Sequence, residues 1–572
     1  MRVLDSRRLT GPSLLLDRAG AVLDIELSDA ERDRALTGWR AAATRLLDAV
    51  GWHGQVLAMR SFAGGASVAF TAPADALYAA TDLNDAAWAS AQAELEGTPG
   101  PDTPATVENL RNAIAAERRP ALQALHDAAR ARGVVFLHGE EQVSVGSGTG
   151  VAVWPDDAIP APAAVDWSRV HEVPIALVTG SNGKTTTVRL LAAMAKAAGR
   201  VAGLTSTDGV AVGGRQIGEG DYSGPSGARL LLRDSAVEVA VLETARGGLL
   251  RRGLTVERAD VAVITNIADD HLGEFGVQDL TTLAETKLLI ARAIGAEGRV
   301  VLNADDPVLV AASRDLTAPI AWFSLAAVNP VVTEHVARGG LAAVLRGDEV
   351  TLLERGRPVV VAKTSEVPIA IGGAARYNVA NALAAVLAAG GLGLPFEAIC
   401  ETLRRFGTDP ADNPGRANLF EVGGVKVLMD YAHNPHGMEA LAAAAAGVPS
   451  TRRLVMLGQA GDRSDEAIRD LARSVMALRP DRVVAKEMDR YLRGRAEGEI
   501  PGIMADEFRR LGLSEAQISA GDVEIRAVEK ALEWARPGDL LILAVHQDRP
   551  VVATLLDRLR RTGWKAGEPL PR

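Results

Sequence analysis

A phosphate-binding loop constrains the fold of this chain more than any other feature. An apolar run begins at Ile175 and ends in a glycine-rich turn, after which Lys184 and Thr185 open an Ala/Leu-rich helix. Small residues let backbone N–H groups close around phosphate oxygens, the helix N-terminus adds positive potential, and the Lys-Thr pair supplies a cation and a hydroxyl for Mg²⁺. The order strand, turn, helix therefore predicts ATP binding. The predicted phosphate contacts are Gly180, Ser181, Asn182, Gly183, Lys184, Thr185 and Thr186.

The loop is shorter than the common P-loop. The usual spacing would place the first glycine at Val178, whereas the first glycine before Gly183 is Gly180. This short spacing narrows the set of families to which the chain can belong.

Length and composition predict a multi-domain enzyme of a reducing compartment. A chain of 572 residues exceeds a single core, and ~150 residues per domain suggests three or four domains. The net charge of −10 argues against a nucleic-acid partner held by a broad basic face. Cys400 is the single cysteine, so no intrachain disulfide is expected, and the N-terminal residues lack the apolar core of a signal peptide. No uncharged apolar run reaches the ~18 residues needed to span a bilayer, so we expect a cytoplasmic chain without a membrane partner.

The sequence divides into three segments of an α/β protein. Residues 1–166 mix strand-like runs with helices expected around Ala30–Val50 and Ala105–Arg132, which indicates an α+β domain ending in a Pro-rich linker at 155–162. Residues 167–413 alternate apolar runs with helical stretches, which is typical of a doubly wound parallel sheet with ligands at the carboxyl ends of its strands.

The third segment, residues 414–572, is a second α/β domain. Within the central segment, Ile320–Ile371 is richer in Val and turn residues and is expected to form a β insertion packed beside the sheet. The expected strands of the two segments are Pro174–Val178, Val237–Leu242, Asp260–Thr265, Arg299–Leu302, Val425–Met429, Arg453–Leu457, Arg482–Ala485 and Leu540–Val545.

Two strand ends carry side chains suited to Mg²⁺ or phosphate. Glu243 directly follows one apolar run, and His271 follows the next, beside Asp269 and Asp270. Because the carboxyl ends of parallel strands share one sheet edge, both should face Lys184. A capping carboxylate and a hydrogen-bonded structural histidine are the alternatives.

Lys287 lies within an apolar helical stripe. Leu283, Ala284 and Leu288 are among the residues whose spacing places them on the same face. Either the lysine stem is buried with its ammonium at the edge, or desolvation lowers the pKa of the amine enough for it to react with CO₂ and become a metal-binding carbamate. The residues alone favour the first alternative.

Further polar side chains end strands or begin helices in the central and third segments. Asn378 and Asn381 are three positions apart, hence on one helix face, where helix capping is the alternative. Arg416 lies in an apparent hinge from which it could reach a terminal phosphate, and Asp430 with His433 could close the third segment over the nucleotide. The candidate nucleotide contacts of this group are Asn303, Asn378, Asn381, Arg416, His433 and Asn434.

With these residues assembled, the chain resembles the Mur ligase superfamily of ATP-dependent amide-forming ligases from Pro174 to Val545. Its phosphate loop is similar to the short loop of that family, with Ser181 where Thr is usual. The resemblance implies two Mg²⁺ sites, with Thr185, Glu243 and His271 as ligands and a carbamylated Lys287 as a further one. It also implies nucleotide contacts from the asparagines named above, an interdomain role for Arg416, and a nucleotide motif at Asp430, His433 and Asn434.

Three motifs further resemble the ligase portion of the cyanophycin synthetases. They are Gly220–Pro225, Glu243–Gly248 and Gly461–Arg463, and the opening Arg7–Pro12 is similar to the start of those enzymes. Their ATP-grasp domain has no counterpart here, because the Pro-rich linker runs directly into the phosphate loop. The resemblance therefore implies one kind of addition, such as arginine to a side-chain carboxylate, unless a separate ATP-grasp ligase partner supplies the other.

The predicted reaction joins a carboxylate to an amine through an acyl phosphate. Lys184, Glu243, His271, Lys287, Arg416 and Asp430 are its candidate catalytic residues. The substrates are an amino acid and a peptide or carrier-bound carboxylate, and Asp462, Arg463 and Arg490 to Arg495 are candidates to hold the amine substrate. A P-loop ATPase or kinase, and a nucleotide-binding scaffold without turnover, are the rival hypotheses.

Overall fold

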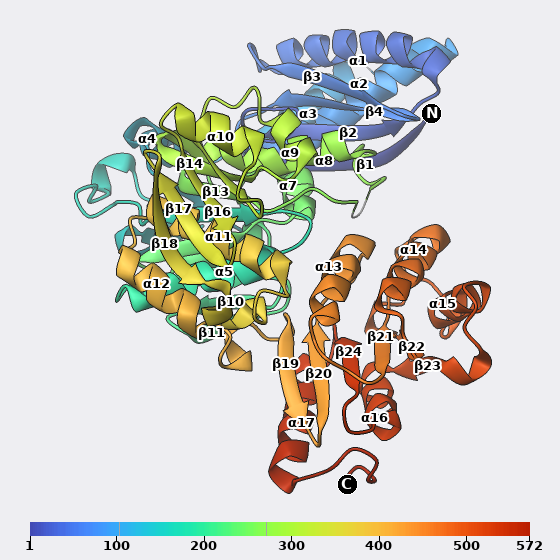
Figure 1. The fold of residues 1–572 in the computed structure, drawn as a ribbon. Coiled ribbons are helices and arrows are strands. Elements are labelled where there is room, and N and C mark those ends of the chain that lie inside the picture. The colour runs from blue at the N-terminus through green and yellow to red at the C-terminus, as the bar shows by residue number, and fades with distance from the viewer. Residues whose placement is uncertain (102, 270–271, 572) are drawn as a thin grey trace.

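The computed structural model describes residues 1–101, 103–269 and 272–571, which form three main units along the chain (Figure 1). The first contains an antiparallel sheet in the order β1-β2-β4-β3. Helices α1 and α2 pack on each other and against this sheet, and their core includes the buried Trp39 and Phe70. The elements are β1 (Arg2–Leu9), β2 (Gly20–Glu26), α1 (Asp29–Ala49), β3 (Leu57–Phe62), β4 (Gly65–Thr71), α2 (Leu77–Glu96) and α3 (Pro104–Glu117).

The helix expected at Ala30–Val50 is confirmed, but the continuous helix at Ala105–Arg132 is wrong. The chain leaves the helical conformation at Arg118 and restarts at Pro120, so α3 is followed by a separate α4 (Pro120–Arg132). Proline suits the first turn of a helix and not its interior. Sequence analysis also missed α2, whose Ala-rich surface shows weak contrast between apolar and polar faces.

A small antiparallel sheet follows, in the order β5-β6-β7. Arg233 of the central unit donates hydrogen bonds to the carbonyl oxygens of Leu137 and Gln142 at 2.9 and 2.8 Å, so this sheet is fastened to the central unit. The strands are β5 (Phe136–His138), β6 (Gln142–Val145) and β7 (Ala152–Pro155).

The central sheet is an α/β sheet in the order β11-β10-β9-β12-β8-β13-β14-β15-β16-β17-β18. Strands β9 to β16 of this order are parallel, and antiparallel strands flank them at both edges. Its strands are β8 (Ile175–Thr179), β9 (Ala202–Ser206), β10 (Gly209–Val212), β11 (Arg215–Glu219), β12 (Val239–Glu243), β13 (Ala259–Ile264), β14 (Ile294–Asn303), β15 (Ile320–Ser324), β16 (Leu341–Arg346), β17 (Glu349–Glu354) and β18 (Arg357–Lys363).

Apolar cores cover both faces of the central sheet, as expected for a doubly wound arrangement. Helices α5 and α11 pack on one face, and α6 to α8 belong to the other. The helices are α5 (Lys184–Ala197), α6 (Pro225–Leu232), α7 (Arg246–Arg252), α8 (Leu280–Leu288), α9 (Pro307–Ala312), α10 (Pro330–Ala337), α11 (Arg376–Gly391) and α12 (Phe396–Arg405).

The predicted separate β insertion at Ile320–Ile371 is wrong. Its first strand, β15, pairs in parallel with β14, and β16 to β18 continue the same sheet by hydrogen bonding. The Val-rich pattern identified strands correctly, but a local pattern does not specify which strand each one pairs with.

The third unit is a six-stranded sheet in the order β19-β20-β24-β21-β22-β23, parallel except for β19. All eight strands expected in the central and third segments are present within a few residues of their expected ends. The elements are β19 (Asn418–Val422), β20 (Val425–Asp430), α13 (Pro435–Ala446), β21 (Arg453–Leu457), α14 (Asp465–Val475), β22 (Arg482–Glu487), α15 (Glu499–Arg510), β23 (Ile518–Val523), α16 (Glu524–Trp534), β24 (Leu540–Ala544) and α17 (Arg549–Thr562).

The first unit is docked on helices of the central unit. Arg60 pairs with Glu285 of α8 at 3.0 Å, and Arg7 donates to the Leu250 carbonyl of α7 at 3.0 Å. Arg292, just after α8, donates to the Ser13 carbonyl at 2.8 Å. Among the described residues, no helix combines the length and apolar character needed to cross a membrane.

Candidate active site

The glycine-rich turn leaves β8 and enters α5 at the carboxyl edge of the central sheet. Gly183 has φ +87°, a left-handed conformation that favours glycine, and a Cβ atom there would overlap the Asn381 side-chain oxygen. The turn therefore packs directly against Asn381 of α11.

Residues just after β13 form hydrogen bonds that fix the conformation of this turn. Ser181 Oγ donates to the Ala268 carbonyl at 2.8 Å, and the Asn182 N–H donates to Asn266 Oδ1 at 2.9 Å. Lys184 Nζ lies 3.0 Å from the Gly180 carbonyl and 3.1 Å from that of Ser181. The lysine therefore lies over the turn, where its charge could meet phosphate oxygens.

Glu243 and Thr185 form a pair of oxygen donors suited to a divalent cation. Thr185 Oγ1 donates to Glu243 Oε2 at 2.9 Å. The Glu243 side chain is buried, and its other oxygen, Oε1, has no hydrogen-bond partner in the described part of the chain. Burial raises the pKa of Glu243, while the nearby charge of Lys184 opposes the rise. A buried carboxylate oxygen without a donor fits a hard cation such as Mg²⁺.

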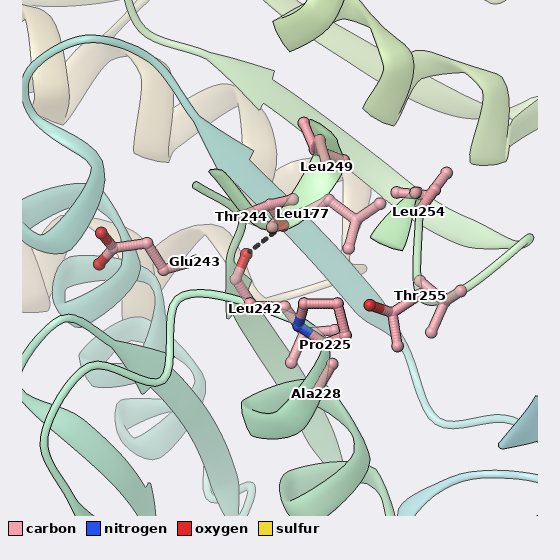
Figure 2. Close-up of a pocket in the computed structure, with 13 residues that line it drawn as sticks. Leu177, Pro225, Ala228, Leu242, Glu243, Thr244, Leu249, Leu254 and Thr255 are labelled. Carbon is pink, nitrogen blue, oxygen red and sulfur yellow. Dashed lines mark hydrogen bonds between the residues drawn. The ribbon is translucent and has the colours of Figure 1, made fainter. Parts of the chain in front are cut away.

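The carboxylate of Glu243 points away from a small cavity behind β12. Figure 2 shows Leu177, Leu242 and Leu249 around this cavity, with Glu243 directed to the opposite side. The cavity has a volume of about 20 Å³. That is room for about one water molecule, so the cavity belongs to the apolar packing of the sheet and not to the nucleotide edge.

The structure leaves the second predicted metal site open. His271 and Asp270 lie outside the described residues. Lys287 is buried in the last turn of α8, on the same short helix as Leu283, Ala284 and Leu288. The described residues contain no group of three or more His, Cys, Asp or Glu side chains that could hold a metal by themselves.

The three predicted amides do not all lie together. Asn378 and Asn381 are buried on one face of α11, where Asn381 donates to Asn378 Oδ1 at 3.2 Å and Asn378 donates to the Ile369 carbonyl at 2.9 Å. Asn303 ends β14 and donates to the Thr265 carbonyl at 3.2 Å. Asn381 therefore borders the phosphate turn, whereas Asn303 braces the neighbouring strand end.

Arg416 extends from the start of the third unit to the phosphate turn. Its guanidinium lies 3.4 Å from Thr185 Oγ1 and stacks on the Tyr431 ring, with 4.1 Å between its central carbon and the ring centroid. Asp430 accepts the Ala417 N–H at 2.7 Å and so fixes the segment beside Arg416. Burial raises the pKa of Asp430, although the charge of Arg416 counteracts this.

Asn434 connects the third unit directly to the phosphate turn. Its side-chain amide and that of Asn182 exchange hydrogen bonds of 3.2 and 3.3 Å, and His436 Nδ1 lies 2.9 Å from Asn182 Nδ2. His433 instead lies 3.1 Å through Nδ1 from the Tyr431 carbonyl. Asn434 is thus a predicted contact that reaches the turn.

Sequence analysis missed an ion-pair cluster across the same junction. Asp208, just after β9, lies 2.6 Å from Arg549 of α17 and 3.2 Å from Arg189 of α5. Burial raises the pKa of Asp208, but Arg416, Arg549 and Arg189 together outweigh it and lower the value to about 2. A strand-end position was the available signal, as for Glu243, but nothing in the sequence links Asp208 to Arg549.

Several of the candidate amine-binding residues form ion pairs within the third unit. Arg493 pairs with Asp462, Arg490 lies 2.9 Å from Asp548, and Arg495 lies 2.8 Å from Asp465. These pairs connect the loop after β22 to the segments that follow β21 and β24 at the carboxyl edge of the third sheet.

A phosphate loop between a central parallel strand and a helix defines the phosphate-loop class of α/β proteins. Within that class, residues 178–389 match the Mur ligase middle domain, and residues 415–544 match the Mur ligase, glutamate ligase domain. The chain belongs to the Mur ligase superfamily.

Known proteins match this chain over different shares of their length. Cyanophycin synthetase from Crocosphaera subtropica is 40% identical over 374 residues, which are 65% of this chain and 42% of that protein. UDP-N-acetylmuramoyl-L-alanyl-D-glutamate–2,6-diaminopimelate ligase from Geobacter metallireducens is 29% identical over 453 residues, or 71% of this chain and 84% of that enzyme. The chain thus spans less than half the length of the cyanophycin synthetase that it matches.

A solved structure shares the fold. Bifunctional folylpolyglutamate synthase/dihydrofolate synthase from Yersinia pestis, crystallised with AMPPNP and a Mn ion, superposes with a TM-score of 0.50 at 22% identity, over 67% of this chain and 88% of that one. The predicted α/β fold class is confirmed by this similarity.

Proposed function

We propose that the chain is an ATP-dependent ligase that joins a carboxylate to an amine through an acyl phosphate. The observation that carries the proposal is the meeting of Lys184, Thr185, Glu243 and Arg416 at one sheet edge, with Arg416 coming from the other side of the junction. Its relatives are named as a synthetase and a ligase, and a protein of related fold was crystallised with AMPPNP and a Mn ion.

The proposed reaction has two steps, the formation of the acyl phosphate and the formation of the amide. A carboxylate oxygen attacks the γ-phosphorus of ATP, and the bond to the ADP oxygen breaks. The amine nitrogen then attacks the acyl carbon, phosphate leaves with the bonding electron pair, and the amine loses a proton. Both steps bring anions together, so positioning and charge neutralisation provide most of the rate enhancement.

The residues of the site have distinct roles in these steps. Lys184 neutralises the β and γ phosphates, and Arg416 stabilises the transferring phosphoryl group. Thr185 and Glu243 would hold Mg²⁺, which when bound supplies positive charge to the phosphate oxygens. Asn182 and Asn434 hold the third unit against the phosphate turn, so that Arg416 is in place only when the two units meet.

A second Mg²⁺ site is proposed at His271 and Lys287, with Lys287 as a carbamate. Its support is the burial of Lys287 on α8, because a buried amine is more easily neutral and able to react with CO₂. This site would orient the attacking carboxylate.

The proposed substrates are an amino acid such as arginine and a side-chain carboxylate of an aspartyl or glutamyl peptide. The 40% identity to a cyanophycin synthetase supports this class. A separate ATP-grasp ligase is the proposed partner that would extend the backbone of such a peptide. Domain boundaries at 166/167 and 413/414 are proposed with this assignment.

The test is ADP and phosphate release with pairs of carboxylates and amino acids, arginine and lysine first, with mass spectrometry of the product. We expect release that needs both substrates and an amide product of matching mass. Lys184→Ala should abolish release, while the exposed Lys565→Ala should not change it. Release independent of any amine would instead indicate an ATPase or kinase, and tight ATP binding with no ADP formed would indicate a scaffold.

A further inference from the structure

A buried ionic cluster lies at the carboxyl edge of the third sheet, outside the residues used above. Lys486 is the next-to-last residue of β22, Glu524 begins α16, and His546 follows β24. The Lys486 ammonium donates to Glu524, to the Ala544 carbonyl at 2.6 Å, and to His546 Nδ1 at 2.9 Å. Glu524 also accepts the backbone N–H groups of residues 546–548 at 2.6 to 2.8 Å.

Every proton of the ammonium group has an acceptor, and the cluster is closed to solvent. Lys486 and Glu524 are 0% exposed and His546 is 6% exposed. The cost of removing these charges from water offsets their mutual attraction, and apolar side chains of similar volume would give an equally or more stable fold. The cluster therefore contributes little to the net stability. A fully satisfied buried network does, however, fix the orientation of each member.

The cluster determines which ring nitrogen of His546 carries the proton. Because Nδ1 accepts from Lys486, the neutral ring carries its proton on Nε2, which lies 3.2 Å from the Ala432 carbonyl. The ring also meets the Tyr431 ring edge-to-face at 5.0 Å between centroids. Tyr431 is the surface on which Arg416 stacks.

We propose that Lys486 and His546 are positioning residues that hold the Tyr431–Asn434 segment in register with the phosphate turn. Lys486 orients the imidazole, the imidazole fixes the Ala432 carbonyl and the Tyr431 ring, and the ring supports Arg416 over Thr185. The same segment ends in Asn434, which bonds to Asn182. The inference rests on the proposed ligase function for its kinetic part only.

Two substitutions of His546 separate its two hydrogen bonds. The amide nitrogen of Gln reaches the place of Nε2, so H546Q keeps a donor for Ala432, whereas the shorter Asn keeps only an acceptor for Lys486. We expect H546N to lower kcat about tenfold, the value of one net hydrogen bond, and H546Q to stay within about threefold of wild type. The dissociation constant of ATP should change less than kcat in both, because the phosphate turn with Lys184 lies in the central unit. His53→Asn is the matched control, since His53 is exposed in the first unit.

A second variant and a second measurement keep the proposal testable. Lys486→Met with Glu524→Gln removes both buried charges at similar volume and should show the same selective loss of kcat. Hydrogen exchange of residues 431–437 should quicken in H546N and not in H546Q, and this readout needs no ligase activity. Unchanged exchange and kcat in H546N would overturn the proposal, as would equal losses in both His546 variants with weakened ATP binding. If the wild type forms no amide but the exchange pattern holds, the ligase function fails and the positioning role stands.

Discussion

Replacing Glu243 by Gln should stabilise the metal-free protein while removing its activity. Within the described ranges of the chain, this buried carboxylate has one oxygen without a hydrogen-bond partner, and burial raises its pKa. When the pKa of a carboxyl group is higher in the folded than in the unfolded state, the free energy of unfolding falls as the pH rises from the unfolded-state pKa to the folded-state pKa. The ionised Glu243 therefore destabilises the fold at neutral pH. An uncharged amide of the same shape can still accept the Thr185 hydrogen bond.

The expected gain is on the order of 1–3 kcal/mol, because the neutral amide avoids the desolvation of a buried charge, although among the described residues its nitrogen is as unpartnered as the oxygen it replaces. For a unit of this size it corresponds to a rise in Tm of roughly 2–4 °C per kcal/mol. Magnesium should reverse the order, because a ligand at ~100 times its Kd stabilises the folded state by about 2.7 kcal/mol and the neutral amide of the Glu243→Gln variant would bind it poorly. Turnover of Glu243→Gln should fall by at least ~100-fold, since metal assistance is worth several kcal/mol.

Thermal unfolding with and without MgCl₂, together with ADP release, measures both effects. Glu219→Gln is the control, because Glu219 is an exposed glutamate on β11 of the same sheet. If Glu243→Gln were less stable than wild type without magnesium, or if magnesium stabilised both equally, the assignment of Glu243 as a metal ligand would be refuted.

Three more substitutions test other parts of the site. Gly183→Ala should weaken ATP binding more than tenfold in a direct binding assay, because its Cβ would overlap Asn381 and its φ of +87° is strained for alanine; binding within twofold of wild type would contradict the turn geometry. Asp208→Asn should cost about 2 kcal/mol near neutral pH, since the ion pair with Arg549 helps hold its pKa near 2. That difference should shrink only as pH falls below about 4 towards 2, and a difference that grew in acid would have the wrong sign. Lys287→Ala should lose activity that short added carboxylates partly restore, and an unchanged rate would exclude this lysine from the site.

Most strands could be predicted because each is a short apolar run that ends in polar residues. Runs such as Ile175–Thr179 and Leu540–Ala544 are buried on both faces, so their sequence carries little else. The phosphate turn could be predicted for a similar reason, since glycines, lysine and threonine must be adjacent in the chain to work.

Features that depend on distant partners could not be predicted in the same way. Strand β15 has an ordinary β pattern, and only its pairing with β14 shows that it extends the main sheet. Asp208 and Arg549 come from different units and meet only in the folded chain.

The break between α3 and α4 at Arg118-Arg119-Pro120, in contrast, could have been predicted from the sequence, because proline begins helices far better than it continues them.

The docking of the first sheet on α7 and α8 has a mechanical consequence. Arg60 forms an ion pair with Glu285 of α8, two positions before Lys287. Arg7 donates a hydrogen bond to α7, a few residues after Glu243. A force on the N-terminal sheet would therefore be transmitted to α7 and α8, and so to the candidate site residues Glu243, which precedes α7, and Lys287, which lies on α8. A chain cut back to its central and third units would lose this support of α7 and α8.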